Sequence, residues 1–427
     1  MTAILFSVML GSLVIGVPVA FSLGIASLVY LVVAKGIPLV MIPQRVFAGL
    51  DNFVLLCIPG FVLAGALMNQ GGITIRIVRF CNALVGHIRG GLALANVVAS
   101  MIFAGISGTA AADAASVGGV MIPAMNRAGY DNKFSCALTA SASTVGPIIP
   151  PSLPMVIAGT MVGLSVGKLF VAGAIPGILM GVGLMALAYY YSVKRGYPKG
   201  ERTTFKELQE SFKDAFWAIF MTILILGGIV LGTFTPTEAA FIGVFYSLIV
   251  GLFVYKELKL KDIPKILLES AISTVAIMML VGFANIFAWI MASDQIPQKV
   301  AAAMLSVSHN PNVILLMINL LLLFVGTFME TIASLIILYP VLYSVTTAVG
   351  IDPIHFTMIA VLNLVIGLIT PPVGVCLFIA CSIGKISLVE ISKNIGPFLA
   401  VLLLVLAIVT YVPEVTLFLP KLLYGVK

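Results

Sequence analysis

The sequence predicts an all-α polytopic membrane protein, an inverted repeat of about five transmembrane helices plus one re-entrant hairpin per half. Hydrophobic residues fill 61% of its 427 positions and charged residues only 9%, against roughly a quarter charged in a soluble domain. Apolar runs of about 20 residues, long enough to cross a bilayer, recur from Thr2 to Val412. In addition, a set of identical residues in the two halves is separated by one fixed distance along the sequence.

Adding 221 to a residue number in the first half gives an identical residue in the second half at positions that include the eight pairs below. Most of these are Gly, Pro or Asp, which serve backbone geometry rather than hydrophobicity. Shared apolar composition therefore does not explain the matches, and duplicated, broken-helix membrane proteins usually move solutes. The pairs are Phe103 and Phe324, Gly105 and Gly326, Ala112 and Ala333, Gly129 and Gly350, Asp131 and Asp352, Gly146 and Gly367, Pro150 and Pro371, and Pro151 and Pro372.

The apolar runs divide the chain into matching spans. The first half has candidate spans at 2–15, 18–34, 52–70, 134–160 and 168–193, and the second at 215–232, 236–255, 264–292, 355–380 and 395–412. We predict a first repeat over 1–196 with its hairpin at about 90–126, and a second over 215–427 with its hairpin at about 312–346. A cytoplasmic linker with an interfacial helix fills 197–214, and mixed apolar and charged residues predict further interfacial helices near 37–50 and 258–267.

The number of spans per half and the charges predict that the halves are oppositely oriented. Five is odd, so a hairpin that enters and leaves on one face inverts the second copy. Arg127 and Lys133 follow the first hairpin, whereas the turn at 350–353 after the second contains no Lys or Arg. The segment 194–213 holds six basic residues, which places it in the cytoplasm and both termini outside. No basic residue precedes the first apolar run, so we expect a retained span rather than a signal peptide.

The tip of the first hairpin, 104–119, is too rich in small and hydroxyl residues to face lipid. Non-helical backbone at membrane depth needs protein or a water-filled cavity around it. Tight packing of small residues is the alternative explanation, but Asp113 favours a functional site because a carboxylate inside a membrane is costly.

Each hairpin is followed by a Pro-Pro pair, 45 residues after a Gly of the hairpin (150 − 105 and 371 − 326). Adjacent prolines remove amide donors and break a helix, and the freed carbonyl groups are suitable ligands for Na⁺, a hard cation. A simple kink is the alternative. We expect two or more Na⁺ sites. The candidate ligands are Ser107, Gly108, Gly146, Ile149 and Pro151 in the first repeat, and Gly326, Thr327, Glu330, Gly367, Thr370 and Pro372 in the second.

A hairpin tip between two half-helices also offers amide donors and a positive dipole end to an anion. A carboxylate substrate fits this chemistry. The candidate polar contacts are Ser107, Thr109, Asp113, Ser143, Thr327 and Asn363.

The segment 232–240, at the extracytoplasmic end of two spans, contains a helix start. Thr235 is expected to be the N-cap, Pro236 the first helical residue and Glu238 the capping-box partner. A gating or docking role is the alternative.

Four segments, 107–114, 146–152, 234–240 and 367–374, resemble the large membrane subunit of tripartite ATP-independent periplasmic (TRAP) transporters. The resemblance extends over essentially the whole chain. It implies an elevator-type transporter in a bacterial inner (cytoplasmic) membrane, which takes up organic acids such as C4-dicarboxylates or sialic acids with Na⁺. The implied partners are a small four-helix membrane subunit, expected as a separate chain, and a periplasmic substrate-binding protein, besides membrane lipid.

Other functions are less well supported by the sequence. A binding-protein-independent antiporter or channel of a related fold stays open. An intramembrane enzyme with Asp113 and Glu330 as an acid pair is a distant alternative, since no nucleophile, His or metal cluster accompanies them. The sequence also shows no nucleotide-binding loop, so we expect an ion gradient rather than ATP hydrolysis to drive transport. We therefore expect neither enzymatic activity nor a nucleic-acid partner.

Overall fold

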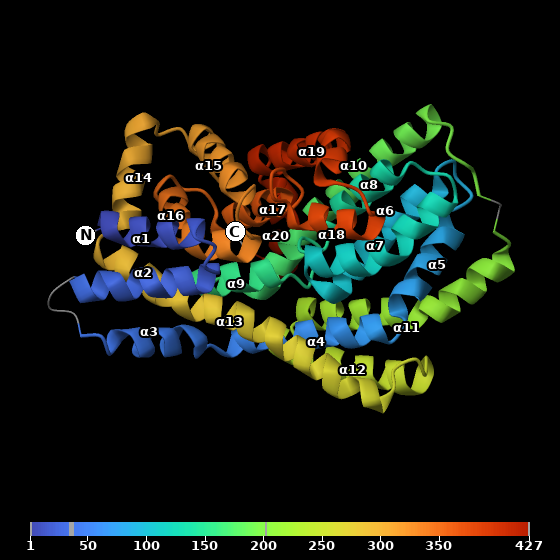
Figure 1. Cartoon of the computed structure of the whole chain (residues 1–427), viewed down its shortest axis with the longest axis horizontal. Coiled ribbons are helices and arrows are strands. Elements are labelled where there is room, and N and C mark those ends of the chain that lie inside the picture. Colours follow the sequence, from blue (N-terminus) through green and yellow to red (C-terminus); the bar gives the residue numbers. More distant parts are fainter. Residues whose placement is uncertain (1, 34–37, 201–202, 426–427) are drawn as a thin grey trace.

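The chain folds as a bundle of α-helices, which confirms the predicted fold class (Figure 1). The structure is a computed structural model and describes residues 2–33, 38–200 and 203–425. Within these ranges there is no β-strand, only an isolated bridge between Arg89 and Lys199. By length and composition, seven helical segments of the described chain can cross a membrane. These are Phe53–Gln70, Val166–Lys194, Phe205–Val230, Pro236–Val254, Leu260–Ser293, Thr331–Ala348 and Leu388–Tyr411.

The first half contains a hairpin, a broken helix and the helices that surround them. Its elements are α1 (Thr2–Val14), α2 (Val19–Val33), α3 (Met41–Leu50), a 3₁₀ turn (Phe53–Leu56), α4 (Cys57–Gln70), α5 (Ile73–Val85), α6 (Gly91–Ser107), α7 (Ala110–Arg127), α8 (Asn132–Ser143), α9 (Leu153–Val162) and α10 (Val166–Lys194). The hairpin is α6 and α7, and the broken helix is α8 and α9.

The second half has the same order, except that the single helix α13 stands where the first half has α3, the 3₁₀ turn and α4. Its elements are α11 (Phe205–Val230), α12 (Pro236–Ile249), a π-helical turn (Val250–Val254), a 3₁₀ turn (Leu260–Asp262), α13 (Ile263–Ser293), α14 (Ile296–Val307), α15 (Pro311–Gly326), α16 (Thr331–Ala348), α17 (Pro353–Gly367), α18 (Val375–Gly384), α19 (Leu388–Tyr411) and α20 (Glu414–Tyr424). Here α15 and α16 form the hairpin, and α17 and α18 the broken helix.

The repeat is visible in the helix bounds as well as in the residues. With 221 added, the first residues of α6 to α10 fall within one residue of the first residues of α15 to α19. The two hairpins lie toward opposite ends of the long axis, α6 and α7 on the right and α15 and α16 on the left in Figure 1. The two hairpins therefore enter the molecule from opposite ends, as an inverted repeat requires.

Two interfacial segments differ from the prediction. The helix expected near 258–267 is only a 3₁₀ turn that leads directly into α13, because Pro264 suits a first helical turn and the apolar sequence after it continues the helix. The helix expected in the linker is the first part of α11, which begins at a Thr204–Glu207 capping box and runs unbroken into the span. Helix α3 lies in the third expected segment; Ile37 and residues 201–202 are outside the described residues.

The repeats are interleaved around the hairpins. Helix α7 packs against α18 and α9 against α16, so each hairpin contacts the broken helix of the other repeat, while α10 packs against α19. Outside this group, α12 packs on α4 and α2 on α13. The broken helices are thus enclosed by protein from both halves.

Candidate transport site

Both Pro-Pro stretches interrupt their helices. Helix α8 ends at Ser143 and α9 begins only at Leu153, while α17 ends at Gly367 and α18 begins at Val375. The peptide bonds Pro150-Pro151 and Pro371-Pro372 are cis. A simple kink in a continuous helix, the alternative considered from the sequence, is therefore wrong.

Each hairpin tip is closed by an N-cap at equivalent positions. Gly108 adopts a left-handed conformation (φ 63°), and the Thr109 hydroxyl then accepts a hydrogen bond from the amide of Ala112 at 3.3 Å. Glu330, which stands 221 residues after Thr109, accepts bonds from the amides of Ile332 and Ala333 at 2.8 and 3.1 Å. Thr109 and Glu330 thus serve the same capping function although their side chains differ.

Each tip contacts the interrupted stretch of its own repeat. The carbonyl of Gly108 accepts a hydrogen bond from the amide of Leu153 at 3.4 Å, and that of Thr327 accepts one from the amide of Val373 at 3.4 Å. In the second repeat the backbones of Gly326 and Gly367 touch, since a Cβ on Gly367 would lie 2.5 Å from the carbonyl oxygen of Gly326. The structure therefore brings together only part of each predicted cation set, Gly108 with Pro151 and Gly326 with Gly367. Ile149 instead lies against Gly177 of α10, and the Thr370 hydroxyl donates to the carbonyl of Ile366 at 2.9 Å.

Asp113, which the sequence predicts as a substrate contact, instead lies beside Ser107 and Gly146 of the first predicted cation set. Its side chain is fully buried, and one carboxylate oxygen accepts a hydrogen bond from the Ser107 hydroxyl. The other oxygen has no hydrogen-bond partner and lies where a Cβ on Gly146 would be. A buried carboxylate with a free oxygen against a helix break is suited to hold a cation and unsuited to hold an anion.

The second repeat has a polar atom of the same kind at the equivalent position. Ser334 follows Asp113 by 221 residues, is fully buried and has a hydroxyl without a hydrogen-bond partner. Sequence reasoning missed Ser334, although the repeat spacing pointed to it. Among the described residues no group of three or more His, Cys, Asp or Glu side chains is arranged for a metal, so hydroxyl and carbonyl oxygens would have to supply most ligands.

The predicted substrate residues do not all meet. Ser107 and Thr109 line a cavity of about 330 Å³ between the first hairpin and the outer helices. Ser143 instead donates to the carbonyl of Thr139 at 2.8 Å, and Asn363 donates to the side chain of Asn319 at 2.7 Å. Thr327 lies at the other tip, where its hydroxyl donates to the carbonyl of Phe324.

Outer helices complete this cavity with polar residues that sequence reasoning also missed. Asn69 of α4 and Ser273 of α13 line it together with Ser116 of α7. A second cavity of about 320 Å³ lies between α3, α13, α9 and α16 and includes Asn52, the repeat equivalent of Ser273. A smaller cavity of about 80 Å³ lies between the two tips and is lined by Thr109, Pro147, Glu330 and Cys376, among others.

Two oppositely inserted hairpins, each closed on a broken helix beside polar cavities, define a transport permease of the inverted-repeat class. The chain belongs to the DctM component family of the tripartite ATP-independent periplasmic transporters, because the family profile matches residues 6–415. It is accordingly an integral protein of the inner membrane.

Characterised relatives extend over nearly the whole chain. The sialic acid TRAP transporter large permease protein SiaM of Vibrio cholerae is 44% identical over 97% of both chains. The C4-dicarboxylate large permease DctM of Pseudomonas aeruginosa is 42% identical over 88% of both. The isethionate permease DctMQ of Oleidesulfovibrio alaskensis is 42% identical over 95% of this chain but only 64% of its own length.

A solved structure agrees with the fold. The YdaH transporter of Alcanivorax borkumensis, described as having an unusual topology, superposes with a TM-score of 0.61 over 86% of each chain at 15% identity. At that identity the match supports the architecture only.

Proposed function

We propose that this permease takes up a small organic acid, such as a C4-dicarboxylate or sialic acid, together with Na⁺. The observation that carries the proposal is the pair of unpartnered, fully buried polar atoms, on Asp113 and Ser334, at equivalent positions beside the two helix breaks. A buried polar group without a partner costs free energy unless something binds it. Two such positions support two cation sites.

The substrate site that fits best is the cavity of about 330 Å³ lined by Ser107, Thr109, Asn69 and Ser273. Thr109 begins α7, so the first amides of that helix and its dipole favour an anion nearby. Relatives named for sialic acid, isethionate and C4-dicarboxylates all carry small organic anions. We place the cation sites behind this cavity, at Asp113 and the breaks.

Movement of the hairpins past the outer helices is the proposed transport step. The cavities of about 330 and 320 Å³ both lie between hairpin or broken-helix elements and α4, α3 or α13, so a sliding central group can open one as it closes the other. A small four-helix membrane subunit, as a separate chain, and a periplasmic binding protein are the proposed partners.

Reconstituted proteoliposomes test this function. The permease, the proposed small membrane subunit and the proposed binding protein together are expected to support uptake of a radiolabelled organic acid driven by an inward Na⁺ gradient. Uptake that proceeds equally with K⁺ or choline would contradict Na⁺ coupling. Uptake by the permease alone, without a binding protein, would favour the antiporter or channel alternative.

A further inference from the structure

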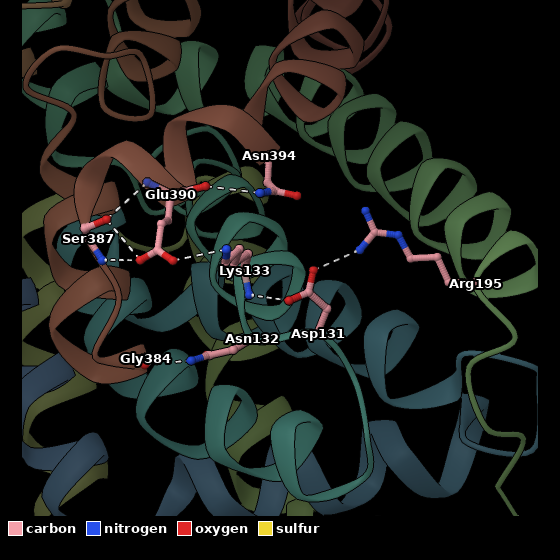
Figure 2. A network of polar contacts seen from close by, with 8 residues as sticks. All are labelled: Asp131, Asn132, Lys133, Arg195, Gly384, Ser387, Glu390 and Asn394. Carbon is pink, nitrogen blue, oxygen red and sulfur yellow. Dashed lines mark hydrogen bonds and ion pairs between the residues drawn. The ribbon is translucent and has the colours of Figure 1, made fainter.

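A polar network at the predicted cytoplasmic end joins the two broken helices across the repeats (Figure 2). Lys133, in the first turn of α8, forms an ion pair with Glu390 of α19 at 3.1 Å. The side chain of Asn132 donates to the carbonyl of Gly384, the last residue of α18, at 2.7 Å. Asp131 pairs with Arg195 at 3.2 Å, which connects α8 to the end of α10.

Several members of this cytoplasmic network also hold their own helix ends. Asp131 caps α8 by accepting from the amide of Lys133 at 3.1 Å. Glu390 completes the capping box of α19, accepting from both the amide and the hydroxyl of Ser387 at 3.0 Å. Glu390 is thereby fixed at its own helix end, and Asn132 also accepts a hydrogen bond from Asn126 at 2.8 Å. Their cross-repeat contacts with Lys133 and Gly384 therefore restrict how far one helix end can shift against the other.

The network lies at the far ends of the half-helices that carry the helix breaks. Helix α8 runs from the network to the break at Gly146, and α18 runs back to it from the break at Pro371-Pro372. The two half-helices also pack against each other along their length. Since α-helices are stiff rods over such lengths, a shift at the network moves one break relative to the other.

At the equivalent positions of the opposite end, the described residues form no ion pair between the repeats. The residues equivalent to Asn132, Lys133 and Glu390 are Pro353, Ile354 and Leu169, which cannot form one. The equivalent of Arg195 is Thr416, which makes a neutral hydrogen bond with the buried His355 at 2.8 Å.

We propose that Lys133, Glu390 and Asn132 are positioning residues, which set the distance between the two cation sites by fixing α8 against the α18–α19 turn. The inference rests on the proposed Na⁺ coupling. Weakening the network should therefore reduce apparent Na⁺ affinity while leaving the maximal rate of uptake at saturating Na⁺ nearly unchanged.

Two substitutions remove the ion pair with little other change. Lys133→Met keeps the aliphatic stem, and Glu390→Gln can still accept the capping-box hydrogen bond. Each is expected to raise the half-saturating Na⁺ concentration about two- to fivefold, the range open to a partly exposed ion pair. The double variant is expected to be no worse than either single one, and Lys133→Arg is expected to restore the wild-type value. Choline chloride keeps the ionic strength constant, since salt screens such pairs.

The matched control is Lys265→Met, which removes the exposed Lys265–Glu269 pair of α13 and is expected to leave Na⁺ dependence unchanged. Wild-type uptake without Na⁺ dependence would overturn the proposed function and this inference with it. Na⁺-dependent wild-type uptake with unchanged half-saturation in Lys133→Met and Glu390→Gln would overturn the inference alone. A lower maximal rate and melting temperature with unchanged half-saturation would assign the network a structural role and would equally overturn it.

Discussion

Gly367→Ala should separate the second hairpin tip from its helix break. The added Cβ would lie 2.5 to 2.7 Å from the carbonyl oxygen, the carbonyl carbon and the Cα of Gly326. All three are backbone atoms, so no side chain can rotate to make room. Inserting a methyl group into a filled site costs about 1–3 kcal/mol, and the higher helix propensity of Ala, up to about 1 kcal/mol, offsets only part of this.

The expected consequence is a loss of Na⁺ affinity at the second site. If the cost falls on the closed arrangement of tip and break, 1–3 kcal/mol corresponds to about 5- to 150-fold in the half-saturating Na⁺ concentration. The assay is uptake in proteoliposomes over a Na⁺ titration, with the melting temperature of the purified protein measured alongside it.

Two further glycines make this a graded series. Gly326→Ala is expected to be milder, since its Cβ would lie 3.3 Å from the nearest atom, the Cα of Gly367. Gly396→Ala in α19 meets nothing within 4 Å and should leave transport unchanged. Wild-type Na⁺ dependence in Gly367→Ala, or equal damage in Gly396→Ala, would refute the reasoning.

Three other substitutions test separate parts of the site. Asp113→Asn should raise the half-saturating Na⁺ concentration at least about tenfold. Its melting temperature in Na⁺-free buffer should be equal to that of the wild type or higher, because the variant buries no carboxylate oxygen without a partner. An unchanged Na⁺ titration would contradict this. Asn69→Ala should raise the half-saturating substrate concentration without altering the Na⁺ dependence of uptake. If only the Na⁺ dependence changed, the cavity of about 330 Å³ would not be the substrate site. Thr235→Ala should lower the stability by about 1 kcal/mol through loss of its capping box with uptake constants unchanged, relative to Thr233→Ala in the exposed turn; altered uptake at full stability would favour the gating role.

The helix breaks were predictable because a proline acts on its own backbone. Pro150-Pro151 and Pro371-Pro372 remove amide donors wherever the chain places them, and the structure shows both interruptions. The Thr235–Glu238 capping box was predictable for the same reason and is present in the structure. Such local features depend on a few neighbouring residues.

Features that depend on packing were less accessible from sequence. The sequence indicates that Asp113 is buried at a hairpin tip, but not that its free oxygen lies against Gly146 rather than facing the cavity. Similarly, α5 is not predicted as a transmembrane span, because it is short and contains two arginines, yet it connects α4 to the first hairpin. Asn69 and Ser273 are single polar residues in apolar spans, and only the fold brings them to the same cavity.

The two proposed cation sites differ in charge, and the repeat spacing shows which pair of equivalent residues carries that difference. Thr109 and Glu330 differ in charge, yet both cap a hairpin helix, and the Glu330 carboxylate is engaged by two amides of α16. The electrostatic difference falls instead on Asp113 and Ser334, whose unpartnered atoms are a carboxylate oxygen and a hydroxyl. A cation at the first site gains a full negative charge in a low-dielectric setting, whereas one at the second depends on carbonyl and hydroxyl dipoles. We therefore expect the first site to bind its cation more tightly than the second. The second site should be more sensitive to how closely its hairpin tip approaches the helix break, because Gly326 and Gly367 leave no spare room there.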